Sequence, residues 1–118
     1  MLTVASTCRY FLYRPVADMR KGFDGLSGLV RNELQCDPLS GDVFIFFNKR
    51  RNQVKLLLWE GDGYSIYYKR LEGGTYELPT VSDRQTVTLR SDELMLILQG
   101  ISLKSIRRRK RYERNKNN

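Results

Sequence analysis

Clusters of lysine and arginine are the residues of this chain whose type and spacing most clearly suggest chemistry, because such clusters bind phosphate groups. The chain holds 21 lysine and arginine residues and 13 aspartate and glutamate residues, a net charge of +8. Eight basic residues and one acid lie between Lys104 and the last residue, so this tail carries +7 and residues 1–103 carry +1. A nearly neutral domain with a basic tail is typical of proteins that bind polyanions, above all nucleic acid. The alternative is a solvated tail that only aids solubility.

The candidate nucleic-acid-binding residues fall into four groups along the chain. Two lie at the start of a predicted helix, three form a polar loop, and six belong to the tail. The other two share one face of a predicted hairpin with Trp59, Tyr64 and Tyr68, whose rings could stack on bases. The full set is Arg20, Lys21, Lys49, Arg50, Arg51, Lys55, Arg70, Lys104, Arg107, Arg108, Arg109, Lys110 and Arg111. In the alternative interpretation, the aromatic residues belong to the core and the cations to an ordinary solvated surface.

Residues for catalysis are few. The chain has no histidine, which excludes serine–histidine and cysteine–histidine catalysis and histidine-based metal sites. Cys8 and Cys36 cannot close a zinc site alone, and we expect both to be reduced thiols. A metal-dependent nuclease would need clustered carboxylates, but Asp18 is placed to cap a helix and Asp62 precedes a glycine in a turn. We therefore predict no catalytic residue, no metal site and no cofactor.

A predicted hairpin positions the aromatic and basic residues of the central stretch. Val43–Phe47 is an apolar run that predicts a covered strand, and residues 48–52 form the polar loop after it. The strands at 54–59 and 64–71 flank the turn at Gly61-Asp62. This turn would place Trp59 opposite Tyr64, Leu57 opposite Ile66 and Lys55 opposite Tyr68. We expect the other face, which carries Val54, Leu56, Leu58, Ser65, Tyr67, Lys69 and Leu71, to be the core face.

The remaining segments complete an α+β pattern. We predict further strands at 8–16, 75–78 and 86–89, a helix from Asp18 to about Leu34, and a second helix capped by Ser91. The fold class is therefore α+β: an antiparallel sheet of about five strands with one or two packed helices and a basic C-terminal tail. Residues 1–103 should form a single domain, and residues 104–118 should be disordered when unbound. No apolar run approaches the length of a membrane span and no secretory signal is recognisable, so we expect a cytoplasmic protein without membrane contact.

Several motifs occur together, and in matching order, in a known family. They are the ADMRKGFDGL run at 17–26, the DPLSG turn at 37–41, the FIF run at 44–46 with Lys55, the WEGDG turn at 59–63 and the KRLEGG turn at 69–74. These motifs resemble the TnpB-type accessory proteins, encoded by the second reading frame, of the IS66 family of bacterial insertion sequences. The resemblance covers roughly residues 10–100.

The resemblance implies a non-catalytic accessory protein of DNA transposition, acting beside a separate transposase that carries the DNA-cutting carboxylates. The implied partners are nucleic acid, with DNA first, and the transposase of the same element. Two alternatives are a protein-interaction module for the transposase without direct DNA binding, and a metal-dependent nuclease. The sequence predicts no oligomeric state.

Overall fold

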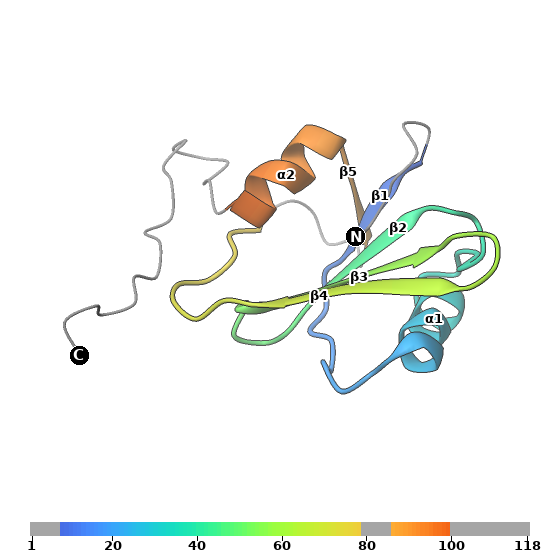
Figure 1. The fold of residues 1–118 in the computed structure, drawn as a ribbon, viewed down its shortest axis with the longest axis horizontal. Helices are drawn as coiled ribbons and strands as arrows, with labels where there is room; N and C mark the ends of the chain where they lie inside the picture. The colour runs from blue at the N-terminus through green and yellow to red at the C-terminus, as the bar shows by residue number, and fades with distance from the viewer. Residues whose placement is uncertain (1–7, 79–85, 100–118) are drawn as a thin grey trace.

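A five-stranded sheet with the strand order β4-β3-β2-β1-β5 forms the centre of the molecule (Figure 1). The computed structural model describes residues 8–78 and 86–99, and the predicted basic tail at 104–118 lies outside these residues. The strands are β1 (Tyr10–Tyr13), β2 (Val43–Phe47), β3 (Gln53–Trp59), β4 (Tyr64–Arg70) and β5 (Thr86–Leu89). The helices are α1 (Phe23–Asn32) and α2 (Ser91–Gln99). The predicted α+β class is confirmed.

The sheet is mixed, because β1 and β2 run parallel while the other three neighbouring pairs are antiparallel. Parallel neighbours need a crossover connection, and α1 with its flanking loops supplies it between Tyr13 and Val43. The prediction of an antiparallel sheet is therefore wrong for this one pair of strands. The hairpin register was predicted correctly: Trp59 pairs with Tyr64, Leu57 with Ile66 and Lys55 with Tyr68.

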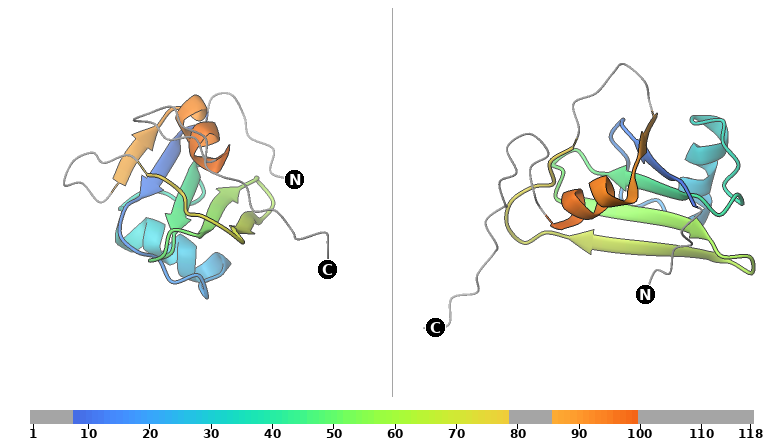
Figure 2. Two further views of the ribbon diagram at one scale, coloured as in Figure 1. Left: turned by 90° about the vertical axis from the view of Figure 1, so that its left-hand side faces the viewer. Right: turned by 90° about the horizontal axis from the view of Figure 1, so that it is seen from above.

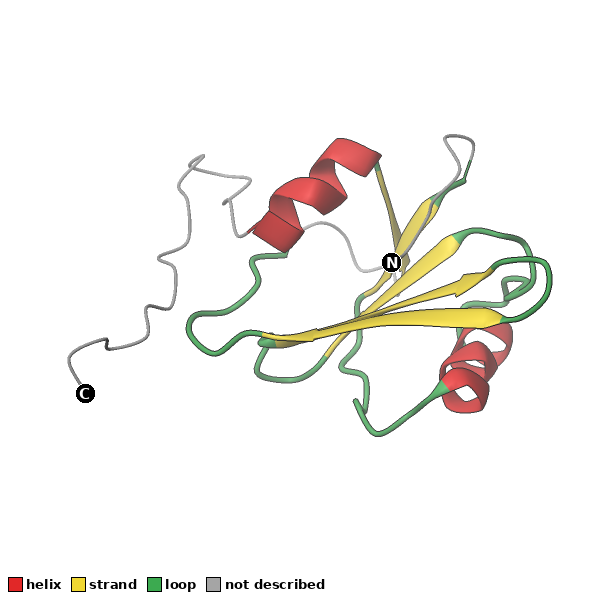
Figure 3. Cartoon of the chain, in the orientation of Figure 1, coloured by secondary structure: helices red, strands yellow, loops and turns green. Residues whose placement is uncertain are grey.

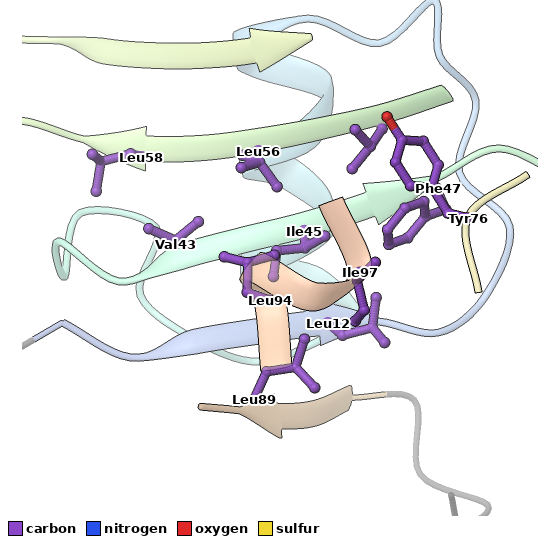
Figure 4. Packing of buried hydrophobic residues seen from close by; sticks show 11 residues of the cluster. Leu12, Val43, Ile45, Phe47, Leu56, Leu58, Tyr76, Leu89, Leu94 and Ile97 are labelled. Atoms are coloured by element: carbon purple, nitrogen blue, oxygen red, sulfur yellow. The ribbon is translucent and has the colours of Figure 1, made fainter. Parts of the chain in front are cut away.

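The two helices cover opposite faces of the sheet (Figure 3). Leu26 and Val30 of α1 pack on one face, against Phe44, Phe46 and Leu57. On the other face, Leu94 and Ile97 of α2 join a cluster from β1, β2, β3 and β5 (Figure 4). Strand β2 is therefore buried at all five positions, which explains its unbroken apolar sequence.

The face of the hairpin that was predicted to be core is not covered at β4. The α2-side cluster contains no residue of β4, and Tyr67 and Lys69 are exposed there. Both had been assigned to the core face, and that prediction is wrong because the α2-side cluster ends at β3. Strand β4 is the edge of the sheet, with no further strand beyond it among the described residues (Figure 2, right).

Three local predictions also differ from the structure. Residues 75–78 form no strand; instead the Tyr76 backbone N–H donates to the Arg51 carbonyl (2.7 Å) and its ring packs on Phe47. Helix α2 already includes Ser91, and the Glu93 carboxylate accepts a hydrogen bond from the backbone N–H of Arg90. Helix α1 begins at Phe23, five residues after Asp18. Neither helix is long and apolar enough to cross a membrane.

Candidate nucleic-acid interface

The loop between β2 and β3 presents three cations on a backbone fixed by two asparagines. The Asn48 Oδ1 atom accepts hydrogen bonds from the backbone N–H groups of Asn52 (3.0 Å) and Gln53 (2.9 Å). The Asn48 side-chain amide also donates to the Asn52 Oδ1 atom (2.6 Å). This network holds the loop with Arg51 at a φ of 57°, a left-handed conformation that side chains seldom adopt. Lys49, Arg50 and Arg51 lie between the asparagines, and all three are exposed.

The loop lies beside the end of β4, so basic residues far apart in sequence gather at one end of the sheet. The Leu71 backbone N–H donates to the Asn52 carbonyl (2.7 Å), and Arg70 pairs with Gln53 across the strands. The two segments meet at the left of the sheet in Figure 1. We call this end of the sheet the basic end, and its cations are Lys49, Arg50, Arg51, Lys69 and Arg70.

Most of the charge at the basic end is available to a ligand. Arg70 forms an ion pair with Glu72 (2.9 Å), in which both side chains are well exposed. Within residues 8–78 and 86–99, no ion pair is seen for the other four cations. Sequence reasoning missed Lys69, because strict alternation along β4 had assigned it to a buried face. The signal that could have identified Lys69 was its position directly beside Arg70, which the sequence had already indicated as a candidate.

Arg20 and Lys21 lie in a turn just ahead of α1 and not within its first turn. The Asp18 carboxylate accepts hydrogen bonds from the Arg20 backbone N–H (2.9 Å) and guanidinium (2.7 Å), and closes a turn ahead of α1. Gly22 is the N-cap of α1, without a side-chain hydrogen bond. Hydrogen bonds from Arg20 lower the pKa of Asp18 to about 2, so the pair stays ionised at neutral pH. The Arg20 side chain is 91% exposed, but its charge is balanced by Asp18.

The structure gives Lys55 a structural role. Lys55 is only 8% exposed, although it was a candidate for nucleic-acid contact. Its Nζ atom donates to the carbonyls of Met19 (2.7 Å) and Lys21 (2.8 Å) and lies 4.6 Å from the centroid of the Tyr68 ring. These contacts fasten the segment before α1 to the sheet. We therefore leave Lys55 out of the basic end.

The six candidate residues of the tail lie outside the described residues. Lys104, Arg107, Arg108, Arg109, Lys110 and Arg111 remain predictions from the sequence.

The carboxylates that could serve catalysis are not gathered. Across residues 8–78 and 86–99, no group of three or more histidine, cysteine, aspartate or glutamate residues could hold a metal ion. Glu60 instead accepts a hydrogen bond from the Ser65 hydroxyl. Asp42 is buried, and its carboxylate binds the Arg9 guanidinium (2.9 Å) and the Ser40 hydroxyl (3.0 Å). Cys8 and Cys36 are free thiols.

Comparison with known protein families finds a match over most of the chain. The model of the IS66 Orf2-like proteins matches residues 8–108. The chain belongs to the IS66 Orf2-like family. The family resemblance inferred from the sequence motifs is thus confirmed.

Two relatives from Sinorhizobium fredii (strain NBRC 101917 / NGR234) are similar over most of their length. The uncharacterized protein y4jC is 33% identical over 92 residues, which cover 78% of each chain. The uncharacterized protein y4hO is 28% identical over 101 residues, 86% of this chain and 87% of the relative. No solved structure matches this IS66 Orf2-like chain.

Proposed function

We propose that this protein is a non-catalytic accessory protein of IS66-type transposition that contacts nucleic acid through its basic end. Membership of the IS66 Orf2-like family supports the link to a mobile element. The nucleic-acid contact is supported chiefly by one observation: three exposed cations stand on a loop whose backbone is fixed by Asn48. Phosphate contacts of this kind set affinity and position without reading sequence. The tail adds charge to the same binding, and the cytoplasm, where the element's DNA lies, is the expected site of action.

Fixing the loop favours binding. Long basic side chains lose rotamer freedom when they meet a phosphate, and a mobile loop would lose backbone freedom as well. The hydrogen bonds from Asn52 and Gln53 to Asn48 order the backbone before the ligand arrives. The remaining loss of freedom is confined to the basic side chains.

Charge removal at the loop tests the proposal. In the full chain, Lys49, Arg50 and Arg51 are changed together to glutamine, and affinity for a short labelled duplex is measured by fluorescence anisotropy. The single variants Arg50→Gln and Arg31→Gln form a matched pair, because both residues are exposed but Arg31 lies in the last turn of α1. We expect the triple variant and Arg50→Gln to bind more weakly, and Arg31→Gln to bind like the parent. Equal losses in Arg50→Gln and Arg31→Gln would contradict a localised interface.

The transposase of the same element is the second candidate partner. Strand β4 is an edge strand of seven residues, and such an edge can accept a strand from another protein through backbone hydrogen bonds. Capture of the element's transposase from nuclease-treated lysate would support direct protein contact. Capture that disappears after nuclease treatment would show that nucleic acid bridges the two.

A further inference from the structure

Exposed aromatic side chains gather at β4. The large apolar side chains that are exposed among the described residues include three aromatic ones, Phe23, Tyr67 and Tyr68. Tyr67 and Tyr68 belong to β4, and the ring of Phe23 stacks on Tyr64 of the same strand at 6.4 Å. Because side chains alternate along a strand, Tyr68 lies on the α1 side of the sheet and Tyr67 on the α2 side.

Tyr68 is exposed and yet held in position. Tyr68 is 53% exposed. Two contacts nevertheless hold it: its hydroxyl donates to the Gln53 side-chain oxygen, and the Lys55 ammonium lies against its ring. Lys55 is itself fixed by the Met19 and Lys21 carbonyls. An aromatic ring that is already oriented loses little freedom when a flat ligand stacks on it.

The charge around Tyr68 suits a nucleic-acid backbone. Arg70 follows on the same face of β4, and its cross-strand partner Gln53 connects directly to the loop that carries Arg50 and Arg51. A chain of nucleotides whose phosphates lie at the basic end therefore has Tyr68 within the same surface. Duplex DNA keeps its bases stacked on each other, so only an unpaired base could use this ring.

We propose that the α1 side of β4 binds single-stranded nucleic acid, with a base stacked on Tyr68 and the phosphates held at the basic end. The proposal rests on the proposed function for the phosphate contacts and adds the form of the ligand. Lys55 then has a positioning role, since it supports the ring from the protein side.

Affinity for single-stranded and duplex probes separates stacking from charge. The full-length Tyr68→Leu variant is titrated with a labelled single-stranded oligonucleotide of mixed sequence and with the duplex of the same sequence. We expect affinity for the single strand to fall about 5- to 150-fold, the range of one lost stacking contact, while duplex affinity stays near that of the parent. Tyr67→Leu is the matched control, because Tyr67 is the adjacent residue on the opposite face and should leave both affinities unchanged.

Three outcomes would overturn the proposal: unchanged single-strand affinity in Tyr68→Leu, an equal fall for both probes, or an equal effect of Tyr67→Leu. Thermal melts show whether the variants remain folded at the titration temperature. Tyr68→Trp keeps a stacking ring, so it should bind the single strand at least as tightly as the parent even if the leucine variant is unstable. A tryptophan variant that loses single-strand affinity would also refute stacking. In a further outcome, the triple variant of Lys49, Arg50 and Arg51 binds the single strand like the parent while Tyr68→Leu binds it more weakly. That result would contradict the proposed phosphate contacts and still support base stacking on Tyr68.

Discussion

Lys55 shows how a buried cation can be satisfied without a carboxylate. Its ammonium group gives two hydrogen bonds to backbone carbonyls and faces the Tyr68 ring, and no ion pair to Lys55 is seen in the described parts of the chain. Burial of a charged group is unfavourable unless its donors find such partners. The contacts join β3 to the segment before α1, which lies 34 to 36 residues earlier in the chain.

Replacing Lys55 tests whether it serves stability or binding. Lys55→Met keeps the apolar stem but removes the donors, so it should lower the free energy of unfolding by roughly 1–3 kcal/mol. Duplex affinity should stay near that of the parent. Lys49→Met, at an exposed loop position, should do the reverse: a thermal melt like that of the parent and weaker duplex binding. A stable Lys55→Met variant with lost duplex affinity would show that Lys55 contacts phosphate after all.

The sequence could show which face of the hairpin Lys55 occupies, but not what covers that face. Alternation and the Asp-Gly turn correctly placed Lys55 with Tyr68, because both signals are local. The Met19 and Lys21 carbonyls reach Lys55 only through the tertiary fold. The same limit applies to Asp18, since an aspartate that caps a helix and one that closes a turn with Arg20 look alike in sequence.

The parallel pair of β1 and β2 is joined at its start by Arg9 and Asp42. The Arg9 backbone N–H donates to the Asp42 Oδ1 atom (3.0 Å), and the Val43 backbone N–H donates to the Arg9 carbonyl (2.8 Å). Burial alone would raise the pKa of Asp42, but hydrogen bonds from Arg9 and Ser40 outweigh burial and lower it. Asp42 is therefore ionised in the folded protein at neutral pH.

The lowered pKa of Asp42 predicts a pH-dependent contribution to stability. An aspartate in the unfolded chain has a pKa near 3.9, so the stabilisation is fully present above about pH 4. It is lost as the pH falls through the lower pKa of the folded state. Asp42→Asn should reduce the free energy of unfolding by roughly 1–3 kcal/mol at pH 7, and the difference from the parent should narrow towards pH 2. Denaturant unfolding at both pH values measures this, with the exposed turn variant Asp62→Asn as control. A difference that does not change with pH would mean that the charge of Asp42 is unimportant.

Elements defined by local signals were predictable, and those defined by distant contacts were not. The β3–β4 hairpin follows from its glycine-rich turn, and both helices follow from their apolar spacing. The parallel pairing of β1 with β2 depends on the path of the crossover through α1, which no short motif encodes. Residues 75–78 look like a returning strand, yet Tyr76 turns into the α2-side core beside Phe47. The sequence also did not show that β4 has exposed side chains on the α2 side, because this exposure depends on where the α2-side cluster ends.

The folded domain separates charges that are nearly balanced in the sequence. The β2–β3 loop and the end of β4 bring five cations to the basic end. The β3–β4 turn, with Glu60 and Asp62, lies at the opposite end of the same two strands. Net charge alone pointed to the basic tail, since residues 1–103 carry a net charge of just +1. A polarised domain can orient an approaching polyanion towards one end before any contact forms.

Salt dependence of duplex binding tests the role of the basic end most directly. The logarithm of the association constant is measured against the logarithm of salt concentration for the full-length parent and for the variant with Lys49, Arg50 and Arg51 changed to glutamine. Each lost phosphate contact should reduce the slope by about 0.9, because fewer counterions are released on binding. We predict a shallower slope and weaker binding at low salt for the triple variant. The same slope and affinity as the parent would show that the basic end does not contact nucleic acid.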